Sequence, residues 1–170
     1  MTAEAAGTGS DLATARRASR LAAVQAIYQM ELTGVDAETV TDEFVSHRFG
    51  SDPDIRAIGT PDEEFFGDVV RGVPHHQAEI DSAIAKCLSS NWKLSRVDSI
   101  LRAILRAGAY EFIARRDVPA KVVIDEYVDV AHAFVEGEDS AFVNAVLDKM
   151  AHRKRAPEFG ETPPDDELQF

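Results

Sequence analysis

The sequence has a single cysteine, Cys87, among its 170 residues. One thiol excludes an internal disulfide and any zinc site built from several thiolates. Ile84 and Leu88 flank Cys87 at helical spacing, which predicts a buried core thiol. The five histidines are scattered, and none has a second histidine four residues away, as a metal-binding helix requires. We therefore predict neither a metal site nor a cofactor.

Long apolar runs are missing as well. No stretch approaches the roughly 18 apolar residues of a membrane span. Residues 1–10 lack the basic and apolar regions of a secretory signal. We expect a soluble, cytoplasmic protein with no membrane partner.

Recognisable catalytic motifs are lacking too. The chain contains no glycine-rich phosphate loop and no nucleophile elbow. Two carboxylate clusters, Glu63 with Glu64 and the acids of residues 125–129, are explained as a helix first turn and a solvated helix face. We predict that the protein is not an enzyme and has no catalytic residues.

The net charge is −12, yet the charges are unevenly distributed. Residues 35–68 carry ten acids and two arginines, and residues 158–170 carry five acids and no base. By contrast, residues 93–121 carry seven bases against three acids, and Arg16, Arg17 and Arg20 cluster near the start. Because an anionic partner responds to local charge, these basic islands are compatible with nucleic-acid binding.

Hydrophobic periodicity predicts an all-α fold. No segment alternates apolar and polar residues for long enough to form a strand, whereas helical spacing recurs throughout. Residues 50–61, with two glycines and two prolines, are predicted to be a loop. Pro74 should kink or split the helix that contains it, and Ser140 or Asp139 should cap the last helix. The first helix is expected to start after a cap among Ser10, Asp11 and Thr14 and to end near Gly34. Further helices are expected at about residues 37–48, 62–89, 97–112, 119–134 and 141–150.

The chain is expected to comprise three parts. Residues 1–12 are predicted to be a flexible segment, residues 13–152 one helical domain, and residues 153–170 a disordered acidic tail. The last expectation rests on the acids of the tail and on Pro163 and Pro164.

The arginines near the start of the first predicted helix are candidate contacts for a nucleic acid. Arg17 continues the apolar line of Leu21 and Val24, and Arg16 and Arg20 lie close to that line. Cations at a helix N-terminus oppose its dipole by about 0.3–1 kcal/mol, so an anion would relieve a cluster there. Two interpretations stay open: a solvated face that aids solubility, or three guanidiniums that bind RNA phosphates and bases.

Phe142 lies at the edge of the apolar arc of the last predicted helix, and Asn144 projects on a different side. One interpretation is that Phe142 belongs to the core. The other is that an edge aromatic beside an amide stacks on and reads an unpaired base. Periodicity does not choose between them.

Three blocks of the sequence occur in the order of a known family. They are residues 15–29 (ARRASRLAAVQAIYQ), residues 97–126, and residues 142–149 (FVNAVLDK). Together these blocks cover most of residues 15–150, and they resemble the bacterial transcription antitermination factor NusB family.

This resemblance implies a NusB-like bundle of about seven helices in two packed sub-bundles, with an RNA-binding domain at residues 13–152. It implies binding to boxA, a single-stranded element of nascent ribosomal RNA transcripts. The implied partners are the small-subunit ribosomal protein NusE and the RNA polymerase antitermination complex, and a homodimer is compatible with the family. By position, the residues that match the RNA-binding face are Arg16, Arg17, Arg20, Tyr28, Phe142 and Asn144.

Ala18 and Ala141 depart from the family pattern, because many members carry a base at these positions. We expect both changes to lower the positive charge of the RNA face, so that affinity rests more on the partner.

Two further hypotheses come from other functional classes. The chain could be a NusB-like helper or recruitment module for a ribosomal RNA-modifying enzyme, or a structural helical protein that dimerises through an apolar face. Steep salt dependence with preference for boxA favours antitermination. Co-purification with a methyltransferase favours the helper, and neither result favours the structural protein.

Overall fold

The computed structural model describes the backbone of residues 4–167 and the side chains of residues 11–167. Within this range the regular structure is helical and no strand occurs, which confirms the predicted fold class. Two compact units, Met1–Pro74 and His75–Phe170, each have their own core. The elements are α1 (Glu4–Thr33), α2 (Ala37–Glu43), η1 (Phe44–Arg48), α3 (Phe49–Ser51), α4 (Pro53–Ile58), α5 (Glu63–His75), α6 (Gln77–Cys87), η2 (Leu94–Arg96), α7 (Ser99–Ala114), α8 (Ala120–Phe134), α9 (Glu138–Lys154), η3 (Ala156–Phe159) and η4 (Asp165–Glu167).

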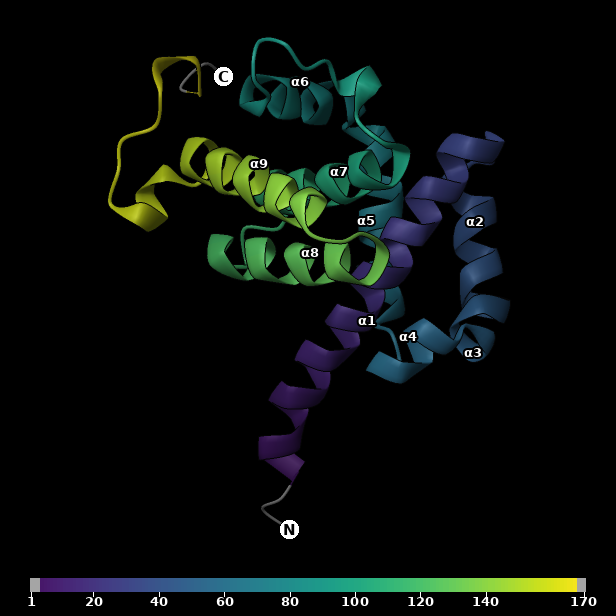
Figure 1. Cartoon of the computed structure of the whole chain (residues 1–170). Helices are drawn as coiled ribbons and strands as arrows, with labels where there is room; N and C mark the ends of the chain where they lie inside the picture. The colour runs from purple at the N-terminus through teal and green to yellow at the C-terminus, as the bar shows by residue number, and fades with distance from the viewer. Residues whose placement is uncertain (1–3, 168–170) are drawn as a thin grey trace. The chain divides into compact units, whose positions relative to one another are not determined.

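In the first unit, the long helix α1 packs against α2 and α4 (Figure 1). Leu21 and Val24 are buried, as their spacing predicted. Three aromatic rings also pack together in this unit: Phe44 stacks on Phe66 with 5.5 Å between ring centroids, and Phe49 meets Phe66 edge-on at 4.9 Å. The unit therefore has an apolar core of its own, to which α1, η1 and α5 contribute.

The predicted loop at residues 50–61 contains the short helix α4, so that prediction is wrong. The carboxylate of Asp52 accepts hydrogen bonds from the backbone N–H groups of Asp54 and Ile55, at 2.9 and 3.1 Å. Pro53 occupies the first turn, where its missing N–H costs nothing. Ile55 is fully buried and fixes the helix to the core. The Asp-Pro pair is thus a helix start.

In the second unit, α7, α8 and α9 pack against one another, and α6 packs against α7 and α9 (Figure 1). The core comprises apolar side chains from all these helices. Gly108 of α7 allows the close approach of α9, because a Cβ atom at this position would lie 2.9 Å from Cδ2 of Leu147. Cys87 is buried, as predicted, and burial raises the pKa of its thiol.

The boundary between α5 and α6 falls where the sequence predicted a break. Pro74 lies in the last turn of α5, and His76, with φ −108° and ψ 20°, separates the two helices. At the other end of the first unit, α1 begins at Glu4, within the segment that was predicted to be flexible; residues 1–3 of that segment lie outside the described residues. Among residues 4–167, no helix is both long and apolar enough to cross a membrane.

Residues 153–167 differ from the disordered tail that was expected. Helix α9 continues to Lys154, and η3 and η4 follow. Acidic side chains of this stretch pair with bases of α6 and α9, among them Glu167 with Lys154 at 2.6 Å. These ion pairs hold the stretch against α6 and α9. The acidic composition of the stretch predicted disorder because it does not show which bases lie nearby in the fold. Residues 168–170 lie outside the described range.

Candidate nucleic-acid interface

The arginine cluster is held at a defined place by Ser19. Its hydroxyl lies 2.9 Å from the carbonyl oxygen of Asp62 and 2.8 Å from the Asp62 backbone N–H. Asp62 in turn caps α5, because its carboxylate accepts from the Phe65 N–H at 3.0 Å. Ser19 therefore connects the α1 turn that carries the arginines to the start of α5.

Two of the three arginines cover an aromatic ring of α5. The guanidinium carbons of Arg16 and Arg20 lie 4.8 and 4.9 Å from the centroid of the Phe65 ring, which is a cation–π arrangement. Arg20 is only 3% exposed and Arg16 is half-buried, whereas Arg17 is exposed. The predicted set of three thus divides into two packing residues and one accessible cation, Arg17.

Ala18 is fully buried, in contrast to the expectation that it lowers the charge of an exposed face. Ala18 therefore belongs to the core and not to the surface on which Arg17 is exposed.

Tyr28 is half-buried on α1 and lies eleven residues beyond Arg17. At about 1.5 Å of rise per residue, the two Cα atoms are about 16 Å apart along the helix. The structure therefore does not bring Tyr28 together with the arginine cluster.

Phe142 has an aromatic neighbour that the sequence analysis missed. Its ring centroid lies 6.2 Å from that of Trp92, with an interplanar angle of 40°. Phe142 is half-buried and Trp92 is 54% exposed, so part of the pair is open to solvent. An exposed aromatic surface of this kind suits base stacking. The available signal was the only tryptophan of the chain, placed in the polar stretch SSNWKLSR.

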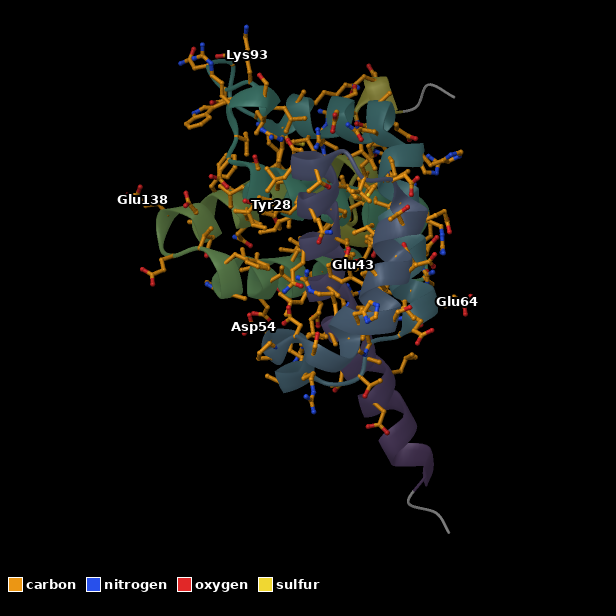
Figure 2. All side chains as sticks on the ribbon, turned by 90° about the vertical axis from the view of Figure 1, so that its right-hand side faces the viewer. Tyr28, Glu43, Asp54, Glu64, Lys93 and Glu138 are labelled. Atoms are coloured by element: carbon orange, nitrogen blue, oxygen red, sulfur yellow. The ribbon has the colours of Figure 1, made fainter. Side chains whose placement is uncertain are left out.

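Two exposed polar residues are close in sequence to the members of this aromatic pair. Asn144 is exposed on α9, and Lys93 follows Trp92 directly in the turn after α6. Figure 2 shows the Lys93 side chain extending outward from this turn. Stacking surface, amide and cation are thus available within one unit.

The turn that leads into Phe142 differs from the predicted cap. Helix α9 begins at Glu138, after Gly137 with φ +56°, rather than after Asp139 or Ser140. Ser140 is instead buried, and its hydroxyl lies 3.2 Å from Nδ1 of His132 on α8. This contact fixes the first turn of α9 against α8.

Much of the basic island at residues 93–121 is used inside the second unit. Arg106 pairs with Asp81 at 2.9 Å, and Arg102 donates to a backbone carbonyl at the start of α7 at 2.6 Å. Arg115 pairs with the aspartate two residues further on at 3.1 Å. The island therefore offers an anionic partner fewer cations than its sequence suggests; the exposed ones are Lys93, Arg96, Arg116 and Lys121.

No group of three or more metal-ligating side chains occurs within the described residues. The buried carboxylate of Glu111 accepts a hydrogen bond from the hydroxyl of Tyr127, between α7 and α8. Because both side chains are fully buried, we interpret this pair as a structural hydrogen bond of the core.

A sequence profile of the NusB family matches residues 17–152, four fifths of the chain. The chain belongs to the NusB family. The transcription antitermination protein NusB of Nitrobacter hamburgensis is 54% identical over 147 residues, which are 86% of this chain and 92% of that protein.

Solved NusB structures have the same fold. NusB of T. maritima superposes with a TM-score of 0.68 at 27% identity, over 91% of this chain and 97% of that one. A chain from a crystal structure of the antitermination factors NusB and NusE with dsRNA gives a TM-score of 0.66 at 26% identity, over 79% of this chain and 94% of that one.

The NusB profile includes most of the candidate residues but not all the basic ones. Arg17 is its first matched residue, and the match contains Trp92, Phe142 and Asn144. Arg16 lies just before it, and residues 153–167 lie after it.

Proposed function

We propose that this chain is a transcription antitermination factor that binds boxA-type RNA of nascent ribosomal RNA transcripts together with the ribosomal protein NusE. In this role it promotes processive transcription by RNA polymerase. The observation that carries the proposal is family membership across residues 17–152, a range that includes the exposed Arg17 and the Trp92–Phe142 pair. The Nitrobacter relative named for antitermination and the solved complex of NusB with NusE and dsRNA support it. The role is one of binding rather than catalysis, and it belongs in the cytoplasm.

Each unit contributes its own RNA contacts. In the first unit, Arg17 binds a phosphate, while Arg16 and Arg20 cover the Phe65 ring of α5 and act as positioning residues. In the second unit, an unpaired base stacks on the open part of the Trp92–Phe142 pair, and Asn144 offers its amide to a base edge. Tyr28 stays a candidate contact that is separate from the arginines.

The test is fluorescence anisotropy of a labelled single-stranded boxA-like RNA, with and without the NusE-type ribosomal protein, against a scrambled RNA of equal length. We expect tighter binding to boxA, strengthened by the protein partner. Equal and weak binding to both RNAs under all conditions would overturn the proposal.

Variants assign the contacts. Phe142→Ala and Trp92→Ala should each weaken boxA binding by about 1–3 kcal/mol, the usual value of one stacked base. Arg17→Ala should weaken binding to both RNAs and reduce the salt slope by about 0.7. Arg56→Ala, which removes an exposed cation of α4, serves as the matched control and should leave boxA binding unchanged.

A further inference from the structure

The second unit contains a cavity of about 520 Å³ that is lined by four cations, three from helices α6 and α9 and one from the loop after α7. Lys86 comes from α6, Arg116 follows α7, and Arg153 and Lys154 belong to the last turn of α9. We call these four residues the basic groove. Of the described lining residues that precede residue 160, Glu79 alone is acidic. The part of the cavity wall that precedes residue 160 is thus strongly cationic.

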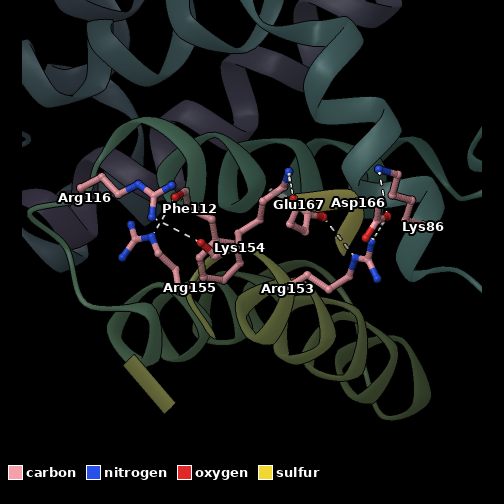
Figure 3. A network of polar contacts seen from close by, with 8 residues as sticks. All are labelled: Lys86, Phe112, Arg116, Arg153, Lys154, Arg155, Asp166 and Glu167. Atoms are coloured by element: carbon pink, nitrogen blue, oxygen red, sulfur yellow. Dashed lines mark hydrogen bonds and ion pairs between the residues drawn. The ribbon is translucent and has the colours of Figure 1, made fainter. Parts of the chain in front are cut away.

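An acidic segment of the same chain, residues 160–167, contributes Pro163, Asp166 and Glu167 to the wall of this cavity, and Figure 3 shows Asp166 and Glu167 beside the groove cations. The carboxylate of Asp166 contacts Lys86 at 3.3 Å and also pairs with Arg153. The carboxylate of Glu167 lies 2.6 Å from Nζ of Lys154 and 3.3 Å from Nε of Arg153. Three of the four groove cations therefore have carboxylate partners from this segment.

The fourth cation, Arg116, has a different partner. One of its Nη atoms donates to the backbone carbonyl of Lys154 at 3.3 Å, as Figure 3 shows. Arg116 is exposed, and its charge lies at the wall of the groove.

The acidic segment is held mainly by charge. The chain reverses at Gly160, which has φ +71°, and Glu161 then contacts Nδ1 of His152 at 2.7 Å. Burial raises the pKa of the Asp166 carboxyl, but the hydrogen bond from Lys86 and the charges of Arg153 and Lys86 outweigh it, so the pKa lies below its ordinary value. The Lys86–Asp166 pair lies at the surface, where ion pairs are weak and are screened by salt, whereas the Glu167 carboxylate is only 8% exposed and is held more firmly. A polyanion that offers several charges at once can therefore displace this segment.

We infer that the basic groove is a binding site for RNA phosphates, and that the acidic segment pairs with three of its cations in cis until RNA displaces it. The inference rests on the proposed RNA-binding function. The Asp166 carboxylate bridges Lys86 and Arg153 where one phosphate oxygen would sit, and the two nitrogens of Arg153 that face the acids suit bidentate binding of a phosphate. The backbone of single-stranded RNA supplies such anions in succession.

The test is the double variant Asp166→Asn/Glu167→Gln in the full-length protein, titrated with boxA-like RNA. If the acidic segment closes the groove, the apparent affinity of the wild type is reduced by the closed fraction, and the variant should bind about threefold to tenfold more tightly. Three freed cations at about 0.7 each should also make the salt slope steeper by about 2.

A matched control separates this mechanism from a general effect of charge. Asp125→Asn/Asp129→Asn changes the net charge by the same amount on the exposed face of α8 and should alter affinity less than twofold. Adding Lys86→Gln/Arg153→Gln to the segment variant should abolish its gain. Circular dichroism melting shows whether each variant is folded.

The outcomes distinguish this inference from the proposed function. If the segment variant binds RNA no better than the α8 control while the wild type still prefers boxA, the groove inference is overturned and the proposed function stands. If neither the wild type nor the segment variant binds RNA, both are overturned. A gain that survives Lys86→Gln/Arg153→Gln also contradicts the groove as the site.

Discussion

At the scale of single residues, Arg155 is a buried cation of the second unit that makes several hydrogen bonds. It is 2% exposed, and its guanidinium donates to the backbone carbonyls of Glu111, Phe112, Arg115 and Val118 at 2.8–3.1 Å. The last carbonyls of a helix have no partner within the helix, and a cation at this end also interacts favourably with the negative pole of the dipole. Arg155 therefore closes the end of α7 from inside the fold.

We predict that Arg155→Met lowers the free energy of unfolding by about 3 kcal/mol, because buried carbonyls and the Glu158 carboxylate lose their donor. Urea denaturation followed by circular dichroism measures the loss. Arg96→Met is the control, since Arg96 is exposed and such substitutions usually change stability by no more than about 0.5 kcal/mol. Equal stability of the two variants would contradict the capping role.

The buried pair of Tyr127 and Glu111 gives a second prediction. Tyr127→Phe removes the hydroxyl that donates to the carboxylate inside the core and should cost about 1–3 kcal/mol. Thermal unfolding measures the change. Tyr28→Phe removes a hydroxyl from a half-buried position on α1 and should leave the melting temperature nearly unchanged; a loss of similar size in both variants would sink the idea.

The sequence predicted the residue types of the candidate site better than their exposure. Spacing placed Arg16, Arg17 and Arg20 on one side of α1, but it could not show that Phe65, more than forty residues later, lies under two of them. The pairing of Trp92 with Phe142 was hidden for the same reason, because the two residues meet only after α9 has packed. Contacts of long sequence separation do not appear in any local pattern.

At the scale of elements, periodicity located the long helices because each buries a regular apolar stripe. The apolar stripe of residues 97–112 predicted α7, and Pro74 predicted the break between α5 and α6. Periodicity failed at α4 and at the start of α9. Both are fixed by single contacts, the Asp52 cap and the Ser140–His132 pair. Such contacts leave no periodic pattern of apolar residues in the sequence.

Helix α8 gives a prediction at this scale. Its Ala120 N–H donates to the Glu158 carboxylate at 2.9 Å, and the same carboxylate accepts from Arg155 at 2.7 Å. Burial raises the pKa of Glu158, but these hydrogen bonds and the charge of Arg155 outweigh it, so the pKa lies below its ordinary value. A lowered pKa stabilises the fold above the unfolded-state value, and this contribution is lost as pH falls through the folded-state value.

Glu158→Gln should therefore cost about 1 kcal/mol or less at pH 7, because the half-exposed carboxylate is replaced by a weaker acceptor. The difference between wild type and variant should shrink as pH falls below 4.5, the ordinary glutamate value. Urea denaturation at pH 7, 5 and 4 tests this. A difference that grows toward low pH would contradict the assignment.

At the scale of the whole molecule, a net charge of −12 coexists with local sites for anions. Several cations of residues 93–121 form ion pairs or hydrogen bonds within the second unit. The acids of residues 160–167 pair with cations of the basic groove. Composition could not predict either arrangement. Charge counted along a sequence treats a paired arginine and an exposed one alike, whereas an RNA strand responds only to cations it can reach.

The salt dependence of boxA binding measures how many cations the RNA reaches. Single-stranded RNA gives a slope of log K against log salt of about −0.7 per phosphate contact. If all seven bases of residues 93–121 bound phosphate, the slope would be about −5. The five exposed residues Arg17, Lys93, Arg96, Arg116 and Lys121 predict about −3.5 for the wild type. Anisotropy titrations at four potassium chloride concentrations distinguish these values, and a wild-type slope near −5 would mean that the internal ion pairs of the second unit open when RNA binds.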